Sequence, residues 1–439
     1  MHGHAHTFKR GVLPLAALVA CHGHARRPHA PPAAPLAIEL AGSIRAVSAD
    51  ELAAYAAVTS NSTTKVSAFR NAHRAWETTT QGAAAALTRA GELLVLAEGR
   101  CNSCQPTADP APNQVNLRGD PAAVLIALDR KTGGVRWKLA FDSTEWTVVS
   151  SLASAGNDVI VGGLFAGTLR AGSHVVSSAG SSDGFIARVS PTGQVAWLVR
   201  VGGAGADGVQ GVAARGDTIA VAGTFTAGAE LLGTPLAPYD ERSPFGDGFV
   251  AALDGKGARR WATTFGGRYD DAVAGVAIDE LGNAVVAATV HDVIKLGDSE
   301  LAAQGDGDGL VAWFSPSGAK RAAVLLGGLE NDGLRSITAA GDQAIVGGYF
   351  AGAIRLGERT LRTAGGEDAF VAALDPDGSV WASWHVAGAG REEIAALATV
   401  YGGFVAAIGH TAAATIERTQ LAAPHDPLAG SAVIVRGIP

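Results

Sequence analysis

The chain has 439 residues, of which 47% are hydrophobic and 17% charged, so it can form a large core and is not globally disordered. With 34 Lys and Arg against 41 Asp and Glu, its net charge is -7, which argues against nucleic acid as a partner. The 58 glycines beside 18 prolines indicate many tight turns between short strands.

The N-terminus predicts export. Two basic residues precede an apolar run, residues 11–20, which is too short to span a bilayer as a helix. The small residues before Cys21 resemble a bacterial lipobox, and the alternative is an ordinary secretory signal that contains a cysteine. Under the first interpretation, residues 1–20 are a lipoprotein signal peptide and acyl chains on Cys21 anchor the protein. The residue after Cys21 is His22. An aspartate at this position would resemble an inner-membrane retention signal, so its absence favours the outer membrane.

Residues 21–73 are predicted to be the acylated cysteine, a flexible linker and a short lead-in. The linker contains Pro, Ala and three histidines, and it predicts a solvated basic tether rather than a fixed metal site. Ser48 to Glu51 resemble a capping box, which predicts the start of a short helix.

Residues 74–439 are built from a repeat. A turn glycine recurs at spacings of 60, 64, 61 and 60 residues, at Gly133, Gly193, Gly257, Gly318 and Gly378. Trp137, Trp197 and Trp261 stand four residues after the first three of these glycines, and alanines replace them in the last two units. Each unit contains four short alternating segments separated by Gly and Asp turns. Four-stranded sheets at a fixed period predict a single all-β propeller.

The chain ends predict how the ring closes. Residues 431–436 look like the first strand of a unit with nothing after it, and Arg74 to Trp76 look like a second strand. We therefore expect the C-terminal strand to pair with the N-terminal blade, which removes exposed sheet edges. Residues 74–439 contain six periods of 61 residues, which favours six blades. If residues 37–73 form a degenerate blade, the count is seven.

The unit motif also carries a resemblance. Units begin with Asp-Gly-Phe at residues 183–185 and 247–249, and with related triplets at 308–310 and 368–370. A glycine pair and an acidic residue follow the tryptophan strand. This pattern is similar to the bacterial β-propeller repeats called SBBP and covers about four fifths of the chain. The resemblance implies the architecture and no particular activity.

An acidic residue stands four positions after the second glycine of that pair. It is Asp207, Asp271 or Asp332, and Glu392 takes the corresponding place in the last unit. A ring of carboxylates could bind cations or supply a catalytic pair. Because the residue recurs in unit after unit, we favour a turn device that accepts backbone N–H groups.

The candidate binding surface lies where units break the pattern. Glu98 and Arg100 stand where other units have the Gly and Phe of Gly-x-Phe, and Thr289 and His291 are assigned to the same positions in another unit. Asp292 follows His291, and an insertion beginning at Tyr239 adds an aromatic and charged loop. Such asymmetry is typical of a site grafted on a repeat, and drift at edge-like positions is the alternative.

Cys101 and Cys104 are predicted to form a disulfide in an exported protein. Half of a zinc site is the alternative, but no second Cys or His pair at matching spacing completes it. We predict no metal site, no catalytic residue and no cofactor.

Residues 127–137 fit the docking motif of quinoprotein-type propellers, a family that includes alcohol dehydrogenases and a non-catalytic lipoprotein scaffold. The motif is complete in one unit only, and the cysteines are not adjacent as in the dehydrogenases. We therefore predict a lipid-anchored envelope module that binds or scaffolds protein or polysaccharide partners and is not an enzyme. A quinoprotein-like or carbohydrate-active propeller enzyme is the alternative.

Overall fold

A computed structural model describes residues 36–41, 43–49, 53–60, 63–70, 73–99, 122–400, 403–417, 419–421 and 431–437. All of them belong to the larger of two compact units, Pro32–Pro439. Within these ranges every regular element is a β-strand.

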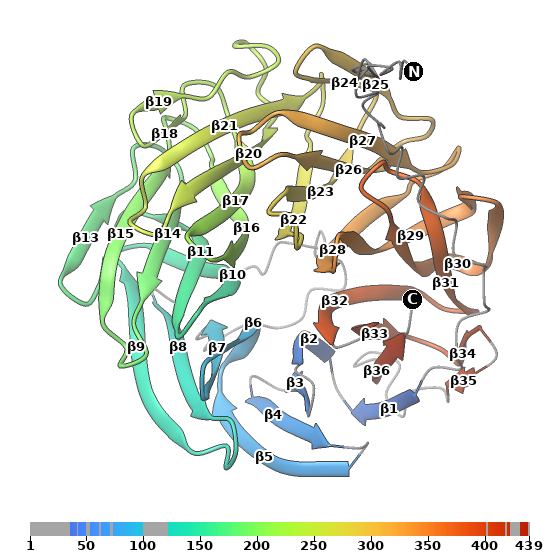
Figure 1. Cartoon of the computed structure of the whole chain (residues 1–439), viewed down its shortest axis with the longest axis horizontal. Coiled ribbons are helices and arrows are strands. Elements are labelled where there is room, and N and C mark those ends of the chain that lie inside the picture. The colour runs from blue at the N-terminus through green and yellow to red at the C-terminus, as the bar shows by residue number, and fades with distance from the viewer. Residues whose placement is uncertain are drawn as a thin grey trace, which may run out of the picture. The chain divides into compact units, whose positions relative to one another are not determined.

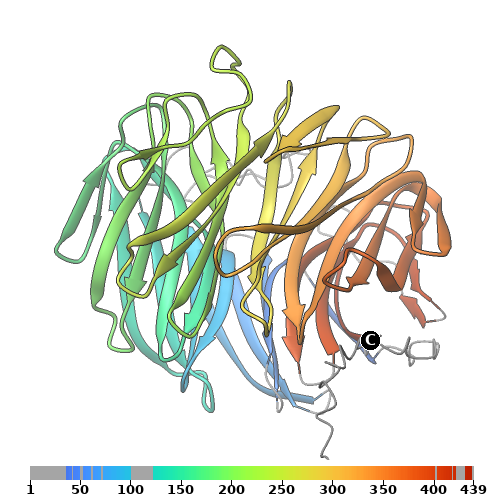
Figure 2. The same cartoon turned by 45° about the horizontal axis from the view of Figure 1, so that its top comes forward.

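The strands form seven antiparallel sheets, and we name each sheet after its innermost strand. Around the ring the innermost strands follow the order β2, β6, β10, β16, β22, β28 and β32, and β32 lies against β2 again (Figure 1). The turned view in Figure 2 shows the sheets standing side by side as the blades of a propeller. The predicted all-β propeller is therefore confirmed.

Every sheet has four principal strands. The innermost strands are β2 (Ser43–Ala49), β6 (Ala83–Ala90), β10 (Trp146–Ala155), β16 (Gly208–Arg215), β22 (Ala272–Ile278), β28 (Gly333–Ala340) and β32 (Glu392–Val400). The second strands are β3 (Ala54–Ser60), β7 (Leu93–Gly99), β11 (Asp158–Ala166), β17 (Thr218–Phe225), β23 (Ala284–Val290), β29 (Gln343–Leu356) and β33 (Gly403–His410). The third strands are β4 (Thr63–Arg70), β8 (Ala122–Asp129), β14 (Asp183–Val189), β20 (Asp247–Asp254), β26 (Asp308–Phe314), β30 (Arg359–Leu374) and β36 (Ser431–Gly437). The fourth strands are β5 (His73–Gln81), β9 (Val135–Ser143), β15 (Val195–Gly202), β21 (Arg259–Gly266), β27 (Lys320–Leu326), β31 (Val380–Gly388) and β1 (Leu36–Ala41).

Four sheets gain a short outer hairpin from the next sheet along the chain. Each hairpin belongs to the connection between the second and third strands of that next sheet, and it pairs with a fourth strand. The hairpins are β12 (Thr168–Ala171) with β13 (His174–Ser177), β18 (Glu230–Leu231) with β19 (Thr234–Pro235), β24 (Val293–Leu296) with β25 (Ser299–Ala302), and β34 (Ala414–Ile416) with β35 (Thr419–Leu421). They tie neighbouring sheets together at the rim of the ring.

The ring closes through the two ends of the chain, as predicted, but the N-terminal partner is β1 and not the strand that contains Trp76, which lies in the β2 sheet. Strand β36 pairs with β33 on one side and with β1 on the other, where Leu36 faces Arg436 and Ala41 faces Ser431. The closing sheet thus takes three strands from the C-terminal end and one from the N-terminal end.

The structure has seven sheets, which is the larger of the two counts that the sequence left open. Residues 43–81 form a complete sheet, β2 to β5, instead of contributing one strand to the closing sheet. The count of six, the propeller boundary at residue 74 and the helix predicted at Ser48 are corrected accordingly, because strands begin at Leu36 and Ser48 lies in β2. The β2 sheet lacks the glycine pair and the acidic residue, so the repeat pattern hides it.

Tryptophans on the fourth strands hold neighbouring sheets together. The indole Nε1 of Trp137 donates a hydrogen bond to the carbonyl oxygen of Pro191 (2.8 Å), in the turn between the third and fourth strands of the next sheet. The same bond joins Trp76 to Arg130 (3.0 Å), Trp197 to Gly255 (3.3 Å) and Trp261 to Pro316 (3.1 Å). The repeating tryptophan and glycine are therefore two sides of one contact between sheets.

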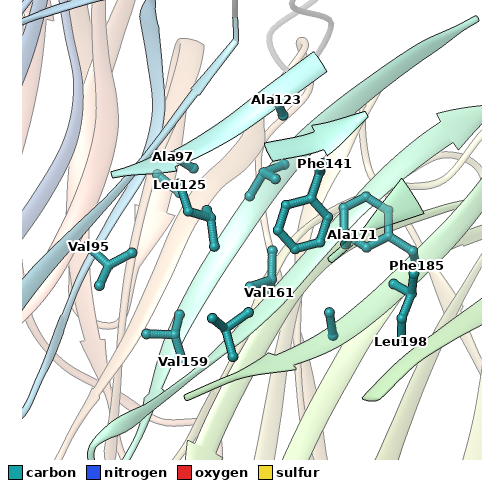
Figure 3. Close-up of a cluster of buried hydrophobic side chains, with 14 of the residues drawn as sticks. Val95, Ala97, Ala123, Leu125, Phe141, Val159, Val161, Ala171, Phe185 and Leu198 are labelled. Atoms are coloured by element: carbon teal, nitrogen blue, oxygen red, sulfur yellow. The ribbon is translucent and has the colours of Figure 1, made fainter. Parts of the chain in front are cut away.

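The core lies between the sheets. In the cluster between the β6 and β10 sheets, the rings of Phe141 and Phe185 stack with centroids 5.4 Å apart, and Phe165 meets Phe185 edge to face. Figure 3 shows Phe141 and Phe185 facing each other across the gap between two sheets, with Leu125 and Val161 beside them. Burial of such clusters between successive sheets is the main stabilising contribution in this fold.

All seven innermost strands carry a β-bulge at the same register position. The bulged residues are Arg45, Ala85, Ser150, Gln210, Ala274, Arg335 and Ala395. All of them line the cavity along the axis of the ring, whose volume is about 1300 Å³. A bulge re-aims one side chain per strand, so the ring presents seven such positions to the cavity.

Candidate binding face

The propeller has two unlike faces. One face carries the connections from second to third strands and those from each fourth strand to the next sheet; we call it the loop face. There the connections bond to each other: Asp207 N–H donates to Ser182 O (2.9 Å), and Asp332 N–H to Gly307 O (2.9 Å). The opposite face, the turn face, carries the tight turns between first and second strands, such as residues 279–283.

On the loop face, the repeated aspartates act as the predicted turn device. Asp207 Oδ2 accepts a hydrogen bond from Gly203 N–H (2.7 Å), and its Oδ1 accepts one from Thr226 N–H (2.7 Å). Asp271 makes the same bonds to Gly267 and His291, and Asp332 to Gly328 and Ala351. Each aspartate thereby joins the connection that leads into its sheet to the connection between the second and third strands of that sheet, which confirms the structural interpretation.

Each of these acids faces a second buried carboxyl group at the start of a third strand. The pairs are Asp183 with Asp207, Asp247 with Asp271, Asp308 with Asp332, and Asp368 with Glu392. A Cβ atom on Gly202 would lie 2.6 Å from the Asp183 carboxylate and 2.8 Å from that of Asp207. The first glycine of each repeated pair is therefore required because the carboxyl groups lie against its Cα.

The four pairs differ in their basic neighbours. Arg200 Nη1 lies 2.7 Å from Asp183 Oδ2, and His385 Nε2 lies 2.8 Å from Asp368 Oδ2. At the same register position the other two sheets have Thr264 and Leu325. The pairs of the β16 and β22 sheets thus lack a basic residue at this position.

Burial raises the pKa values of these carboxyl groups. The pKa of Asp271 is raised to about 7 and that of Asp247 to about 6. Burial also raises the pKa of Asp332 to about 6, and burial with the adjacent Asp368 raises that of Glu392 to about 7. All four groups are almost fully enclosed, and the three aspartates accept hydrogen bonds from backbone N–H groups, so their chemistry serves the fold.

Tyr239 lies on the loop face, 37% exposed, with Lys295 Nζ 5.3 Å from the centroid of its ring. Its N–H donates to Asp247 Oδ2, a bond that the other sheets make with a residue only four positions before the aspartate. The insertion therefore loops out from an otherwise preserved turn.

His291 and Asp292 lie close to this insertion. His291 is half-buried, and its Nδ1–H donates to the carbonyl oxygen of Asp270 (2.7 Å). Asp292 is exposed with a positive φ of 55°. The strand register corrects one detail, because Val290, and not His291, occupies the place of the core phenylalanine in this sheet.

Glu98 does occupy the glycine position, but it is only 2% exposed. Thr80 Oγ1 donates a hydrogen bond to Glu98 Oε1, and Gly82 packs against the same side chain. Glu98 is therefore inside the sheet, away from the candidate surface. Arg100, Cys101, Cys104 and Cys21 lie outside the described residues.

Sequence reasoning missed two aromatic side chains on the loop face. Phe245 is 40% exposed and Tyr269 is 51% exposed, and their ring centroids are 6.1 Å apart. They lie beside the cavity, because Pro244, Gly246 and Asp270 belong to its wall. Only the asymmetry of the insertion signalled them, since sequence does not show which aromatic residues stay exposed.

Within the described ranges, no group of three or more His, Cys, Asp or Glu side chains is arranged to hold a metal ion. The same part of the chain contains no helix of the length and apolarity that crossing a membrane requires.

No protein-family model matches the sequence, and no curated protein does. Among solved structures, the chain is similar to a europium-containing methanol dehydrogenase at 12% identity and a TM-score of 0.44, covering 91% of this chain and 92% of that one. It is also similar to the WD40 domain of Toxoplasma gondii coronin, at 7% identity and a TM-score of 0.44, covering 92% and 86% of the two chains. Because these TM-scores are below 0.5, the likenesses say nothing about activity.

Proposed function

We propose that this chain is a binding module of the bacterial cell envelope, anchored by lipid at Cys21, whose loop face captures a glycan or protein partner. The observation that carries the proposal is the exposed aromatic pair Phe245 and Tyr269 beside the opening of the cavity, with Tyr239 exposed on the same insertion as Phe245. Exposed aromatic side chains next to charged ones are the residues that dominate recognition surfaces.

The aromatic group is confined to one sector of the ring. Tyr239 and Phe245 belong to the connection between β17 and β20, and Tyr269 to the connection between β21 and β22. Leu329, which is 80% exposed, lies on the following loop-face connection. A site needs asymmetry, and this sector supplies it on a scaffold that otherwise repeats.

The carboxyl groups support binding rather than catalysis. Asp271 is 2% exposed and Glu392 is fully buried, so neither reaches a substrate on the surface. The bonds that Asp271 makes go to backbone N–H groups of adjacent connections. We therefore propose that the chain is not an enzyme. The lipid anchor and the envelope location rest on the sequence around Cys21.

The experiment is capture by the immobilised full chain. Purified neutral and acidic polysaccharides and an envelope extract are applied, and retention is compared between the parent and the double variant Phe245→Ala, Tyr269→Ala. We expect the variant to lose at least about tenfold in affinity for the retained partner, because truncated aromatic anchors cost more than 1 kcal/mol.

The matched control is Leu281→Ala. Leu281 is 57% exposed and lies on the turn face, so it tests an apolar surface residue away from the site. We expect its capture to equal that of the parent. Equal capture by the aromatic double variant would contradict the proposal, as would turnover of a sugar or alcohol substrate by the purified chain.

A further inference from the structure

Arg335 is an unusual residue in the wall of the cavity. It is the bulged residue of β28, at a position where five of the seven innermost strands have Ala, Ser or Gln. Only β2, with Arg45, also has a cation there. Arg335 is thus one of two positive groups aimed at the axis from the same level of the ring.

Within the described residues, the guanidinium of Arg335 stacks on an aromatic ring and its Nε has no acceptor. Its central carbon lies 4.3 Å from the centroid of the Tyr349 ring, and Tyr349 is 7% exposed. Its Nε is buried and has no hydrogen-bond partner, and no ion pair to Arg335 forms among the described residues. Burial lowers the pKa of this guanidinium. Leaving the enclosed Nε donor of this charged group unpaired costs free energy that a bound acceptor would recover.

The surrounding charges do not satisfy this arginine. Glu393, Glu367 and Arg391 lie within electrostatic range of it. Glu367 is already paired with Arg391 at 3.0 Å. Glu393 belongs to the next innermost strand and lines the same cavity. A planar, stacked guanidinium with free donors is the group that binds a carboxylate in a bidentate manner.

Arg335 is also near the aromatic sector. Tyr269 directly precedes Asp270 in the cavity wall and leads into β22, and β22 lies against β28 in the ring. A carboxylated sugar carries on one unit both a flat apolar face, which an aromatic ring covers, and an anionic group, which an arginine binds.

We propose that Arg335 binds the carboxylate of an acidic sugar that enters the cavity from the loop face, with Phe245 and Tyr269 contacting the sugar at the opening. This inference rests on the proposed function and names the ligand class of the same site. The sugar binds without any chemical change to it.

The test is equilibrium binding of the full chain to trigalacturonate and trimannuronate, with the methyl ester of trigalacturonate as the uncharged match. We expect the free acids of at least one series to bind, and the ester to bind at least about tenfold more weakly. Arg335→Gln should lose a similar factor. Arg335→Lys should lose less, because it keeps the charge without the planar fork.

The control is Arg215→Gln, which changes the net charge equally. Arg215 lines the same cavity but ends β16 beside the turn face, so we expect unchanged binding. Thermal melting should show that both glutamine variants are folded. If Arg335→Gln is not folded, the binding of Arg335→Lys is compared with that of the parent instead.

Four results would overturn the inference. Three concern the sugars: no binding of either acid, equal binding of acid and ester, or equal losses of affinity in the Arg335 and Arg215 variants. The fourth is binding of hexaglutamate, which has carboxylates but no sugar ring, as tightly as the sugar acids. If capture still depends on Phe245 and Tyr269 while Arg335→Gln has no effect, the inference fails and the proposed function stands. If the aromatic variants also capture normally, both fail.

Discussion

The indole nitrogen of Trp76 donates a hydrogen bond to the backbone carbonyl of Arg130, 3.0 Å away and 54 residues later in the chain. The bond joins β5 to the turn between β8 and β9, and Thr78 Oγ1 adds a second bond to Gly133 O (2.7 Å) in the same turn. The β2 sheet is therefore held to its neighbour by the contact that the repeat uses elsewhere, although its own sequence departs most from the repeat.

Gly133 is predicted to be essential to this contact. It has a positive φ of 75°, and a Cβ atom there would lie 2.6 Å from the Trp76 ring. We expect Gly133→Ala to lower the free energy of unfolding by more than about 2 kcal/mol, because left-handed strain and overpacking add. Urea unfolding measures this change.

Gly156→Ala is the matched control for that variant. Gly156 has a positive φ of 70°, but no atom lies within 4 Å of its added Cβ. Its substitution should cost only roughly 1 kcal/mol. Equal losses in the two variants would show that the Trp76 contact contributes nothing.

Closure of the ring is predicted to control cooperative folding. Strand β36 pairs along its length with both β33 and β1, so a chain ending at Pro427 loses two ladders at once. We expect this truncated chain to expose two sheet edges, to aggregate and to lose a single cooperative thermal transition. A truncated chain that melts at the temperature of the full chain would contradict the closure.

The carboxyl pair Asp247 and Asp271 predicts a stability that falls as pH rises. In an unfolded chain Asp271 titrates near 3.8, and burial raises its pKa to about 7 in the folded chain. The folded chain therefore binds more protons between these values, and the contribution of this group is present at low pH and lost as pH rises through about 7. Each unit of pKa difference corresponds to about 1.4 kcal/mol.

Thr264→Arg tests this explanation. It places an arginine at the register position of Arg200, which neighbours the pair Asp183 and Asp207. We expect the variant to be more stable than the parent above pH 7 and to show a weaker decline between pH 4 and 7, since the cation favours the charged carboxylates. Chemical unfolding at several pH values provides the comparison. An unchanged pH profile would contradict it.

The anchor is predicted from Cys21 alone. Cys21→Ser should release the protein from membranes or leave its precursor uncleaved, because no thiol remains at the signal boundary. Fractionation of cells and the mass of the N-terminal peptide measure both outcomes. A variant that stays bound and is processed normally would refute the lipoprotein assignment.

The repeat glycines and aspartates allowed the propeller and the turn role of Asp207 to be predicted, because each repeats one local contact. Closure by the C-terminal strand was predicted from the strand pattern of residues 431–436, which has no partner strand after it. The blade count was harder, since β3 ends at Ser60 and β4 begins at Thr63, which excludes the long connection of the other units, and the β2 sheet lacks the acidic residue. His291 was misplaced by one position because Val290 is as apolar as the phenylalanine it replaces, and only strand pairing sets the register. Whether Glu98 is buried and Phe245 exposed depends on packing between sheets, which no local pattern records.

The central claim is that recognition takes place on the loop face beside the cavity. Hydroxyl-radical footprinting of the full chain, with and without its captured partner, tests it directly because aromatic side chains react strongly when exposed. The account predicts protection of Tyr239, Phe245 and Tyr269, with Leu281 on the turn face and Val175 on the outer hairpin as reactive as before. Protection at Leu281 or Val175 with the three aromatic residues unchanged would contradict it.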